Sequence, residues 1–288
     1  MLEEGGVAET RVDLPFTMLT RVVIAGLGLI GGSLALALRR GRPDLALAGW
    51  DEESVLAEGL MRGVIDAVCR PEDLADGDVF VIAAPPHASL FLLDALKSLP
   101  PGVIVTDVVS TKRVIVEAAM AKSVRFVGGH PMAGSEKSGL AHASAELFDG
   151  QRWFLVDAGA GDEGNDAVER MVASLGARPE WIDALEHDRL MAAISHLPQI
   201  AASALMAVAG PLAGESNLDL AGAGLRDTTR LAASDPELWS EIAASNAEEL
   251  SRAVRLLREQ LERVEKSLDA SEPLHEFFRT GRRWRGRI

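Results

Sequence analysis

Short apolar runs alternate with helix-forming stretches along the chain as far as residue 183. The apolar runs are typical of buried strands and predict strands at 21–25, 45–50, 78–83, 103–107, 125–128, 153–156 and 178–182. The stretches between them predict helices over 34–41, 87–99, 111–121 and 166–175. This alternation predicts an α/β fold with a doubly wound, mostly parallel sheet, in which ligands bind beyond the carboxyl ends of the strands.

The pattern changes after residue 183, and no strand is predicted from there to the end of the chain. Residues 184–209 predict one long helix, in which Pro198 removes an N–H and is expected to cause a kink near Ile194. Helical spacing is also present over 236–270. A monomeric helical cap is compatible with this all-helical domain. An apolar-rich appendix beside a complete sheet domain favours a subunit interface instead, and we expect a homodimer.

A glycine-rich turn joins the first predicted strand to the first predicted helix. Gly26 allows a tight turn, Gly28 lets a pyrophosphate approach the backbone, and Gly31 lets the helix lie close to the sheet. The helix N-terminus then offers free N–H groups to the diphosphate. Asp51 ends the second strand, where a carboxylate can bind both hydroxyls of the adenine ribose. The agreement of turn, flanks and acid favours Rossmann-type dinucleotide binding over a structural turn in another α/β protein.

The predicted cofactor contacts are Gly26, Gly28, Leu29, Ile30, Gly31, Asp51, Ala84 and Pro85. Asp51, Glu52 and Glu53 place three acids where a 2′-phosphate would lie, with no arginine among them. Repulsion and the lack of a phosphate partner therefore predict NAD rather than NADP as the cofactor.

Composition narrows the possible partners. The 288 residues suffice for two domains, and the net charge of −14 argues against nucleic acid. The single cysteine, Cys69, excludes an intrachain disulfide and a Cys-rich zinc site, and no metal is expected. With an acidic N-terminus and no apolar run of about 20 residues, we expect a cytoplasmic protein without a membrane partner. The Arg-rich stretch at 279–287 is interpreted as a solvated tail, or as a segment that reaches an acidic partner subunit.

Two absences narrow the class of enzyme. The chain has no tyrosine, which excludes the Ser-Tyr-Lys chemistry of short-chain dehydrogenases. The only lysine after Lys137 is Lys266, so the chain lacks the lysine that β-hydroxyacid dehydrogenases use early in their second domain.

His130 and Ser110 are the candidate catalytic residues. His130 lies in a glycine-rich segment at a predicted strand end, and a neutral imidazole suits a general base near pH 7. Ser110 follows the preceding strand, where its hydroxyl can cap a helix and also face the pocket.

Several motifs resemble the prephenate/arogenate dehydrogenases of tyrosine biosynthesis. They are the glycine-rich turn, Asp-Val-Val-Ser-Thr-Lys at 107–112, Gly-His-Pro-Met-Ala-Gly-Ser-Glu at 129–136, Ser-His-Leu-Pro at 195–198, Gly-Leu-Arg-Asp-Thr-Thr-Arg at 224–230, and Trp239. The resemblance implies a nucleotide-binding domain followed by a helical dimerisation domain. It also implies oxidative decarboxylation of a cyclohexadienol, with His130 accepting the hydroxyl proton and Ser110 positioning it. The expected organisation is a mobile tail over 1–20, a dinucleotide-binding domain over 21–183, and a helical dimerisation and substrate domain over 184–288.

The substrate of that reaction carries two carboxylates, so a cation is expected in the pocket. Arg230 is the candidate because a guanidinium fork fits a carboxylate, with Arg226 as the alternative. The remaining substrate contacts implied by the resemblance are Gln199, His196, Ser135, Glu136 and Trp239.

Prephenate and arogenate differ in the side chain of the substrate, so the residue that contacts this side chain decides between them. Gln199 stands where members of the family often carry a histidine, and its amide can donate to the keto group of prephenate, as can His196 if it turns inward. Glu136 could bind the ammonium of arogenate, so arogenate or dual specificity stays open, with prephenate preferred. More remote alternatives are another two-domain hydroxyacid or imine oxidoreductase and a non-catalytic NAD-sensing protein.

Overall fold

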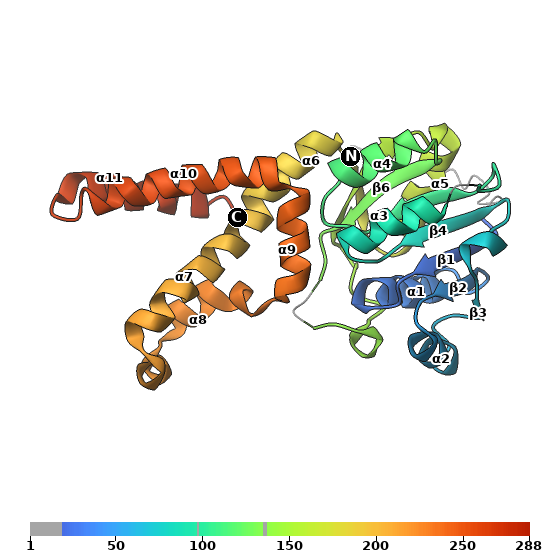
Figure 1. Cartoon of the computed structure of the whole chain (residues 1–288), viewed down its shortest axis with the longest axis horizontal. Helices are drawn as coiled ribbons and strands as arrows, with labels where there is room; N and C mark the ends of the chain where they lie inside the picture. Colours follow the sequence, from blue (N-terminus) through green and yellow to red (C-terminus); the bar gives the residue numbers. More distant parts are fainter. Residues whose placement is uncertain (1–18, 97, 135–136) are drawn as a thin grey trace, which may run out of the picture.

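The computed structural model describes residues 19–96, 98–134 and 137–288 (Figure 1). The predicted tail therefore falls outside the described residues up to residue 18, as do two of the predicted substrate contacts, Ser135 and Glu136.

The N-terminal domain contains an eight-stranded sheet of order β3-β2-β1-β4-β5-β6-β7-β8. Its strands are β1 (Arg21–Ala25), β2 (Ala46–Trp50), β3 (Ala67–Val68), β4 (Asp78–Ile82), β5 (Ile104–Asp107), β6 (Phe126–Pro131), β7 (Arg152–Ala158) and β8 (Arg178–Trp181). All neighbouring pairs are parallel except β6 and β7. The prediction of a doubly wound, mostly parallel sheet is confirmed, and β6 is longer than expected, so that His130 lies inside the strand.

Helices cover both faces of this sheet (Figure 1). They are α1 (Leu29–Gly41), α2 (Glu53–Met61), α3 (Pro86–Ala95), α4 (Arg113–Ala121) and α5 (Gly161–Ser174). Side chains alternate along each strand, so Val22 and Ile24 belong to the core shared with α1 and α5, while Val23 belongs to the core shared with α3 and α4. Burial on both faces explains why the strands are nearly continuous apolar runs.

The C-terminal domain is all-helical, as predicted, and extends away from the sheet (Figure 1). Its helices are α6 (Ala184–Met191), α7 (Leu197–Ala213), α8 (Ala223–Thr229), α9 (Pro236–Ser245), α10 (Ala247–Glu265) and α11 (Ser271–Arg285). A π-helical segment, Ala192–His196, joins α6 to α7 at the place where the kink was expected. Because Pro198 has no N–H, the helix cannot keep regular hydrogen bonds there, and a wide turn satisfies the backbone.

Two sequence interpretations of this domain need correction. The helical pattern over 236–270 is divided by Asn246 into α9 and α10, and the Arg-rich end of the chain forms α11 rather than a tail. By length and composition alone, the helical rod Ala184–Ala213 could cross a membrane, with a mean hydropathy of 1.4 and 28% of its most apolar window buried. The sequence predicted a long helix here but no apolar run of about 20 residues, because polar residues at 186–189, 195–196, 199 and 203 interrupt it.

Candidate active site

The glycine-rich turn forms an open cradle at the N-terminus of α1. Gly26 has φ +99°, and a Cβ there would lie 2.3 Å from the carbonyl oxygen of Ala83. At Gly31 a Cβ would lie 1.8 Å from the carbonyl oxygen of Gly26, so both positions require glycine. At Gly28 a Cβ would meet nothing within 4 Å, and no side chain caps the helix. The turn therefore leaves room for a diphosphate against the free N–H groups of α1, and the residues present fit NAD.

Asp51 holds the same turn from the end of β2. Its Oδ2 accepts the N–H of Leu27 at 2.5 Å, and its Oδ1 accepts the N–H of Glu52 at 2.7 Å. These bonds fix the carboxylate beside the glycine-rich turn.

A cleft of about 880 Å³ separates the cradle from the helical domain. It is lined on the sheet side by Gly28, Leu29, Ile30, Ala84, Pro85, Ser110 and His130, and on the helical side by Gln199, Arg230 and Trp239. The structure thus brings most of the predicted cofactor and substrate residues into one cleft. Gly26, Gly31, Asp51 and His196 are not among the residues that line it.

His130 is the most buried titratable group of this lining, with only 8% of its surface exposed. Burial lowers its pKa well below the ordinary value, and the nearby His187 and Lys112 lower it further. Its ring is therefore neutral at pH 7, as a general base must be. Its Nδ1 lies 2.9 Å from Nε2 of His187, whereas Ser110 lines the same cleft without a bond to this ring among the described residues.

The ring of His130 contacts a buried pair on α6, His187 and Asp188. Nδ1 of His187 lies 2.8 Å from Oδ1 of Asp188, and the two residues are 0% and 1% exposed. Asp183 begins this helix by accepting the N–H groups of Leu185 and Glu186, which places the pair one turn later, against the sheet domain. The sequence analysis missed this pair, although a neighbouring His and Asp just after a helix cap was the signal available.

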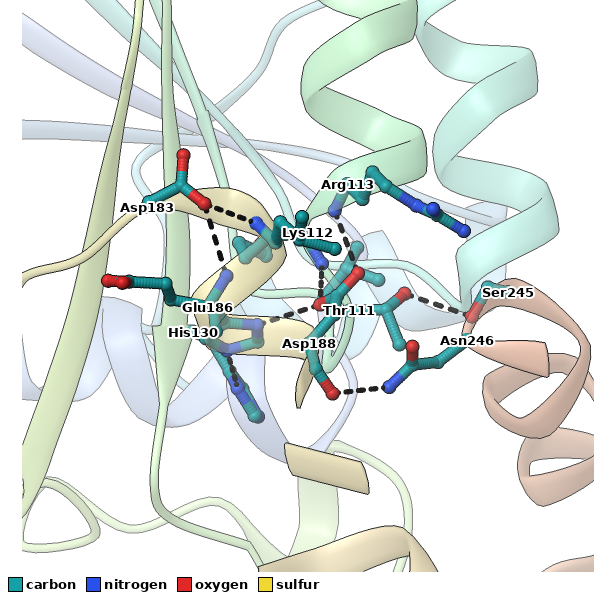
Figure 2. A network of polar contacts seen from close by, with 12 residues as sticks. Thr111, Lys112, Arg113, His130, Asp183, Glu186, Asp188, Ser245 and Asn246 are labelled. Carbon is teal, nitrogen blue, oxygen red and sulfur yellow. Dashed lines mark hydrogen bonds and ion pairs between the residues drawn. The ribbon is translucent and has the colours of Figure 1, made fainter. Parts of the chain in front are cut away.

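The carboxylate of Asp188 is held by the start of α4 (Figure 2). This carboxylate accepts the N–H of Lys112 at 2.7 Å and of Arg113 at 3.0 Å. The side-chain amide of Asn246 donates to the backbone carbonyl of Asp188 at 2.7 Å. Burial alone would raise the pKa of Asp188, but the bonds from His187 and these two N–H groups lower it overall. The group is therefore an ionised acceptor that joins the two domains.

Lys112 has a second role inside the sheet domain. Its ammonium donates to the carboxylate of Asp107 and, at 2.6 Å, to the carbonyl of Gly129. The same carboxylate accepts the N–H groups of Val109 and Gly129, both at 2.9 Å. Both charged side chains are fully buried. Because both of them bond the backbone of Gly129, they hold the residue immediately before His130 against β5.

Two predicted substrate residues of the helical domain are engaged with protein groups. Gln199 donates to the carbonyl of Leu231 at 2.8 Å and so holds the segment that carries Arg230. His196 is 1% exposed, and burial lowers its pKa to about 4. It packs edge-on against Trp239, with ring centroids 6.0 Å apart. Arg230 is exposed in the single chain and takes part in none of the ion pairs between described residues.

A glycine cradle and a buried, neutral histidine that share one cleft between a doubly wound sheet and a helical domain are typical of two-domain, nicotinamide-dependent oxidoreductases. Two family models together cover most of this chain. The prephenate dehydrogenase nucleotide-binding domain matches residues 34–180, and the prephenate dehydrogenase dimerization domain matches residues 183–280. The chain belongs to the prephenate dehydrogenase family.

Individual relatives agree with this assignment. A prephenate dehydrogenase of Lactococcus lactis is 33% identical over 276 residues, which cover 92% of this chain and 76% of the relative. The crystal structure of prephenate dehydrogenase from A. aeolicus in complex with hydroxyphenyl propionate and NAD+ is similar with a TM-score of 0.85 and 28% identity, covering 94% of this chain and 98% of that one. Synechocystis arogenate dehydrogenase is similar with a TM-score of 0.80 and 29% identity, covering 93% and 99%.

Proposed function

We propose that the protein catalyses the NAD-dependent oxidative decarboxylation of prephenate to 4-hydroxyphenylpyruvate in tyrosine biosynthesis. The observation that carries this proposal is the placement of the buried, neutral His130 ring in the cleft onto which the nucleotide cradle opens. Membership of the prephenate dehydrogenase family supports it. The test is NADH formation from prephenate and NAD by the purified protein, with NAD binding measured beside it. Binding without turnover would indicate an NAD-sensing protein instead.

The residues of the cleft divide the chemistry between them. The glycine cradle at the N-terminus of α1 would hold NAD, which would supply the hydride acceptor for the ring carbon that carries the hydroxyl. His130 takes the hydroxyl proton, which creates the carbonyl, and loss of CO₂ then makes the ring aromatic. The oxygen of the product regains a proton, which His130 is placed to return. The protein therefore needs one proton acceptor and no second strong acid.

Arg230 is proposed to bind a substrate carboxylate from the helical side of the cleft. Replacing it by alanine is expected to raise KM for the substrate roughly 10- to 150-fold, the worth of about 1.5–3 kcal/mol for a hydrogen bond to a charged group. Steady-state kinetics would measure this, with kcat changed much less. Arg226→Ala is the matched control, because Arg226 lies on α8 and does not line the cleft. A larger KM effect at Arg226 would transfer the role to that residue.

Prephenate is preferred over arogenate on the basis of Gln199. One amide N–H of Gln199 bonds Leu231, and the other is available to a keto oxygen. Similarity to Synechocystis arogenate dehydrogenase keeps arogenate as the second candidate. Values of kcat/KM measured side by side with NAD decide between them. A ratio that favours arogenate by more than about tenfold, ~1.4 kcal/mol, would overturn the preference.

NAD is expected to be strongly preferred over NADP. Asp51 is held beside the cradle by backbone N–H groups, and Glu52 and Glu53 follow it into the start of α2. These carboxylates would repel a 2′-phosphate. We expect kcat/KM for NAD to exceed that for NADP by at least tenfold, and comparable values for the two cofactors would contradict the assignment.

We also infer that two chains associate through the helical domain to form a homodimer. The family's dimerization domain covers residues 183–280. Large apolar side chains exposed on this domain in the single chain include Ile194, Val208, Leu212, Leu256, Leu261 and Phe278. A two-fold interface would bury them, together with the apolar rod of α6 and α7. Sedimentation at micromolar concentration is expected to give the mass of two chains, and a monodisperse monomer would refute the inference.

A cytoplasmic location and the absence of nucleic-acid and membrane partners complete the proposal. The acidic net charge of −14 and the single, buried Cys69 support it.

A further inference from the structure

We propose that His187 and Asp188 are positioning residues that fix the tautomer of His130, so that its Nδ1 carries the proton and its Nε2 is free to accept one from the substrate. This inference rests on the proposed role of His130 as the general base and extends it to a buried pair on the first helix of the other domain. Neither residue lines the cleft, so neither is assigned a contact with the substrate.

The ionised carboxylate of Asp188 determines the tautomer of His187, and His187 in turn determines the tautomer of His130. Asp188 is ionised and can only accept, so Nδ1 of His187, 2.8 Å away, must carry a hydrogen. His187 is neutral because burial lowers its pKa, which leaves its Nε2 as an acceptor. Nδ1 of His130 lies 2.9 Å from that acceptor and must therefore donate to it. The unprotonated nitrogen of His130 is then Nε2, and His130 itself lines the cleft.

Asp188, where this series of hydrogen bonds begins, is held in place by backbone groups. The carboxylate of Asp188 accepts two backbone N–H groups at the start of α4, from Lys112 and Arg113. The backbone carbonyl of Asp188 accepts from Asn246, between α9 and α10 (Figure 2). With His187 fully buried, its ring has little freedom to rotate or to flip. The docking of α6 on the sheet domain thus determines which nitrogen of His130 is the base.

The hydrogen bond between His130 and His187 becomes stronger when His130 takes a proton. The bond from its Nδ1 to Nε2 of His187 then becomes charge-assisted, which is stronger than a bond between neutral groups. A buried imidazolium without an acceptor would be strongly disfavoured, since nothing would replace the water that burial removes. Loss of the acceptor should therefore lower kcat, while the substrate and NAD bind through other residues.

A matched pair of substitutions at residue 187 tests this. Glutamine places its terminal group where Nε2 of histidine lies and can still accept from His130. Asparagine reaches only the Nδ1 position and keeps the contact to Asp188 alone. We expect His187→Gln to retain kcat within about tenfold. We expect His187→Asn to lose roughly 10- to 150-fold in kcat, with KM and NAD affinity within a few-fold of the original values.

Equal kcat losses in the two variants, or no loss in either, would overturn the proposal, provided that both bind NAD as the original chain does. A second measurement depends neither on the two residue-187 variants nor on turnover. Nitrogen-15 NMR of histidine-labelled protein, with the His130 signals assigned through His130→Asn, is expected to show Nδ1 protonated and Nε2 unprotonated at neutral pH. Protonation at Nε2 would refute the tautomer. If prephenate is not turned over, the proposed function fails, while this NMR result still decides the inference.

Discussion

Replacing His130 by asparagine is expected to lower kcat by about 10²–10⁴, the usual contribution of a positioned general base. Asparagine keeps the polarity and much of the volume of the side chain but cannot accept the hydroxyl proton of the substrate. The cradle that binds NAD is built from other residues, chiefly Gly28 and the N-terminus of α1, so NAD affinity should hardly change. Steady-state turnover of prephenate and a separate NAD titration measure the two quantities.

The control for this substitution is His275→Asn, which changes an exposed histidine on α11. It should leave kcat and KM unchanged. Survival of turnover in His130→Asn to within a few-fold of the original would show that His130 is structural. The base would then have to be sought elsewhere in the cleft.

The pH profile provides an independent measurement of the same group. A general base works in its unprotonated form, and burial lowers the pKa of His130 well below 6.5. Activity should therefore not fall as pH decreases through 6.5, where an exposed histidine would take up a proton. We expect kcat/KM to decrease only at lower pH. A midpoint at or above 6.5 would contradict the burial of the base.

The parts of the site that could be predicted from sequence are those with local signals. Gly26, Gly28 and Gly31 are constrained by the backbone of one turn, and Asp51 follows the next strand, so spacing alone places them. The order of strands and helices was equally accessible, because each is a short stretch with its own period. His130 and Ser110 could be placed in one cleft because parallel strands end at the same edge of a sheet.

The parts that could not be predicted depend on how distant segments pack. Asp188 is 76 residues from Lys112, and Asn246 is 58 residues from Asp188, so their hydrogen bonds exist only after α6 and α10 dock on the sheet domain. Gln199 has the same character, since its bond to Leu231 depends on the path of the chain after α8. The helix break at Asn246 was missed because helical spacing continues on both sides of it, although asparagine is a favoured N-cap residue.

Replacing Lys112 by methionine is expected to lower the free energy of unfolding by about 3–5 kcal/mol, the cost of leaving a buried charge without its partner. Methionine fills most of the space of the lysine stem. The carboxylate of Asp107 would keep its two backbone N–H donors, from Val109 and Gly129, but would lose its counter-ion. Urea unfolding of the two proteins measures the difference.

Two comparison variants separate charge from packing. Lys122→Met removes a lysine whose ion pair with Asp94 is at the surface, so it should change the unfolding free energy by at most about 1 kcal/mol. Adding Asp107→Asn to Lys112→Met should recover part of the loss, because a neutral amide does not need the missing ammonium. Equal losses for Lys112→Met and Lys122→Met would show that the buried pair contributes no more than a surface pair.

The sign of the pH dependence identifies the unpaired carboxylate. Burial raises the pKa of Asp107, and removal of the lysine removes the attraction that opposes this rise. In Lys112→Met the folded chain therefore binds this proton at a higher pH than the unfolded chain does. Stability rises as pH falls wherever the folded state binds more protons, so the deficit of Lys112→Met should shrink from pH 7 toward pH 4. A deficit that stays constant over this range would attribute the loss to packing around the lysine stem, and not to the charge of Asp107.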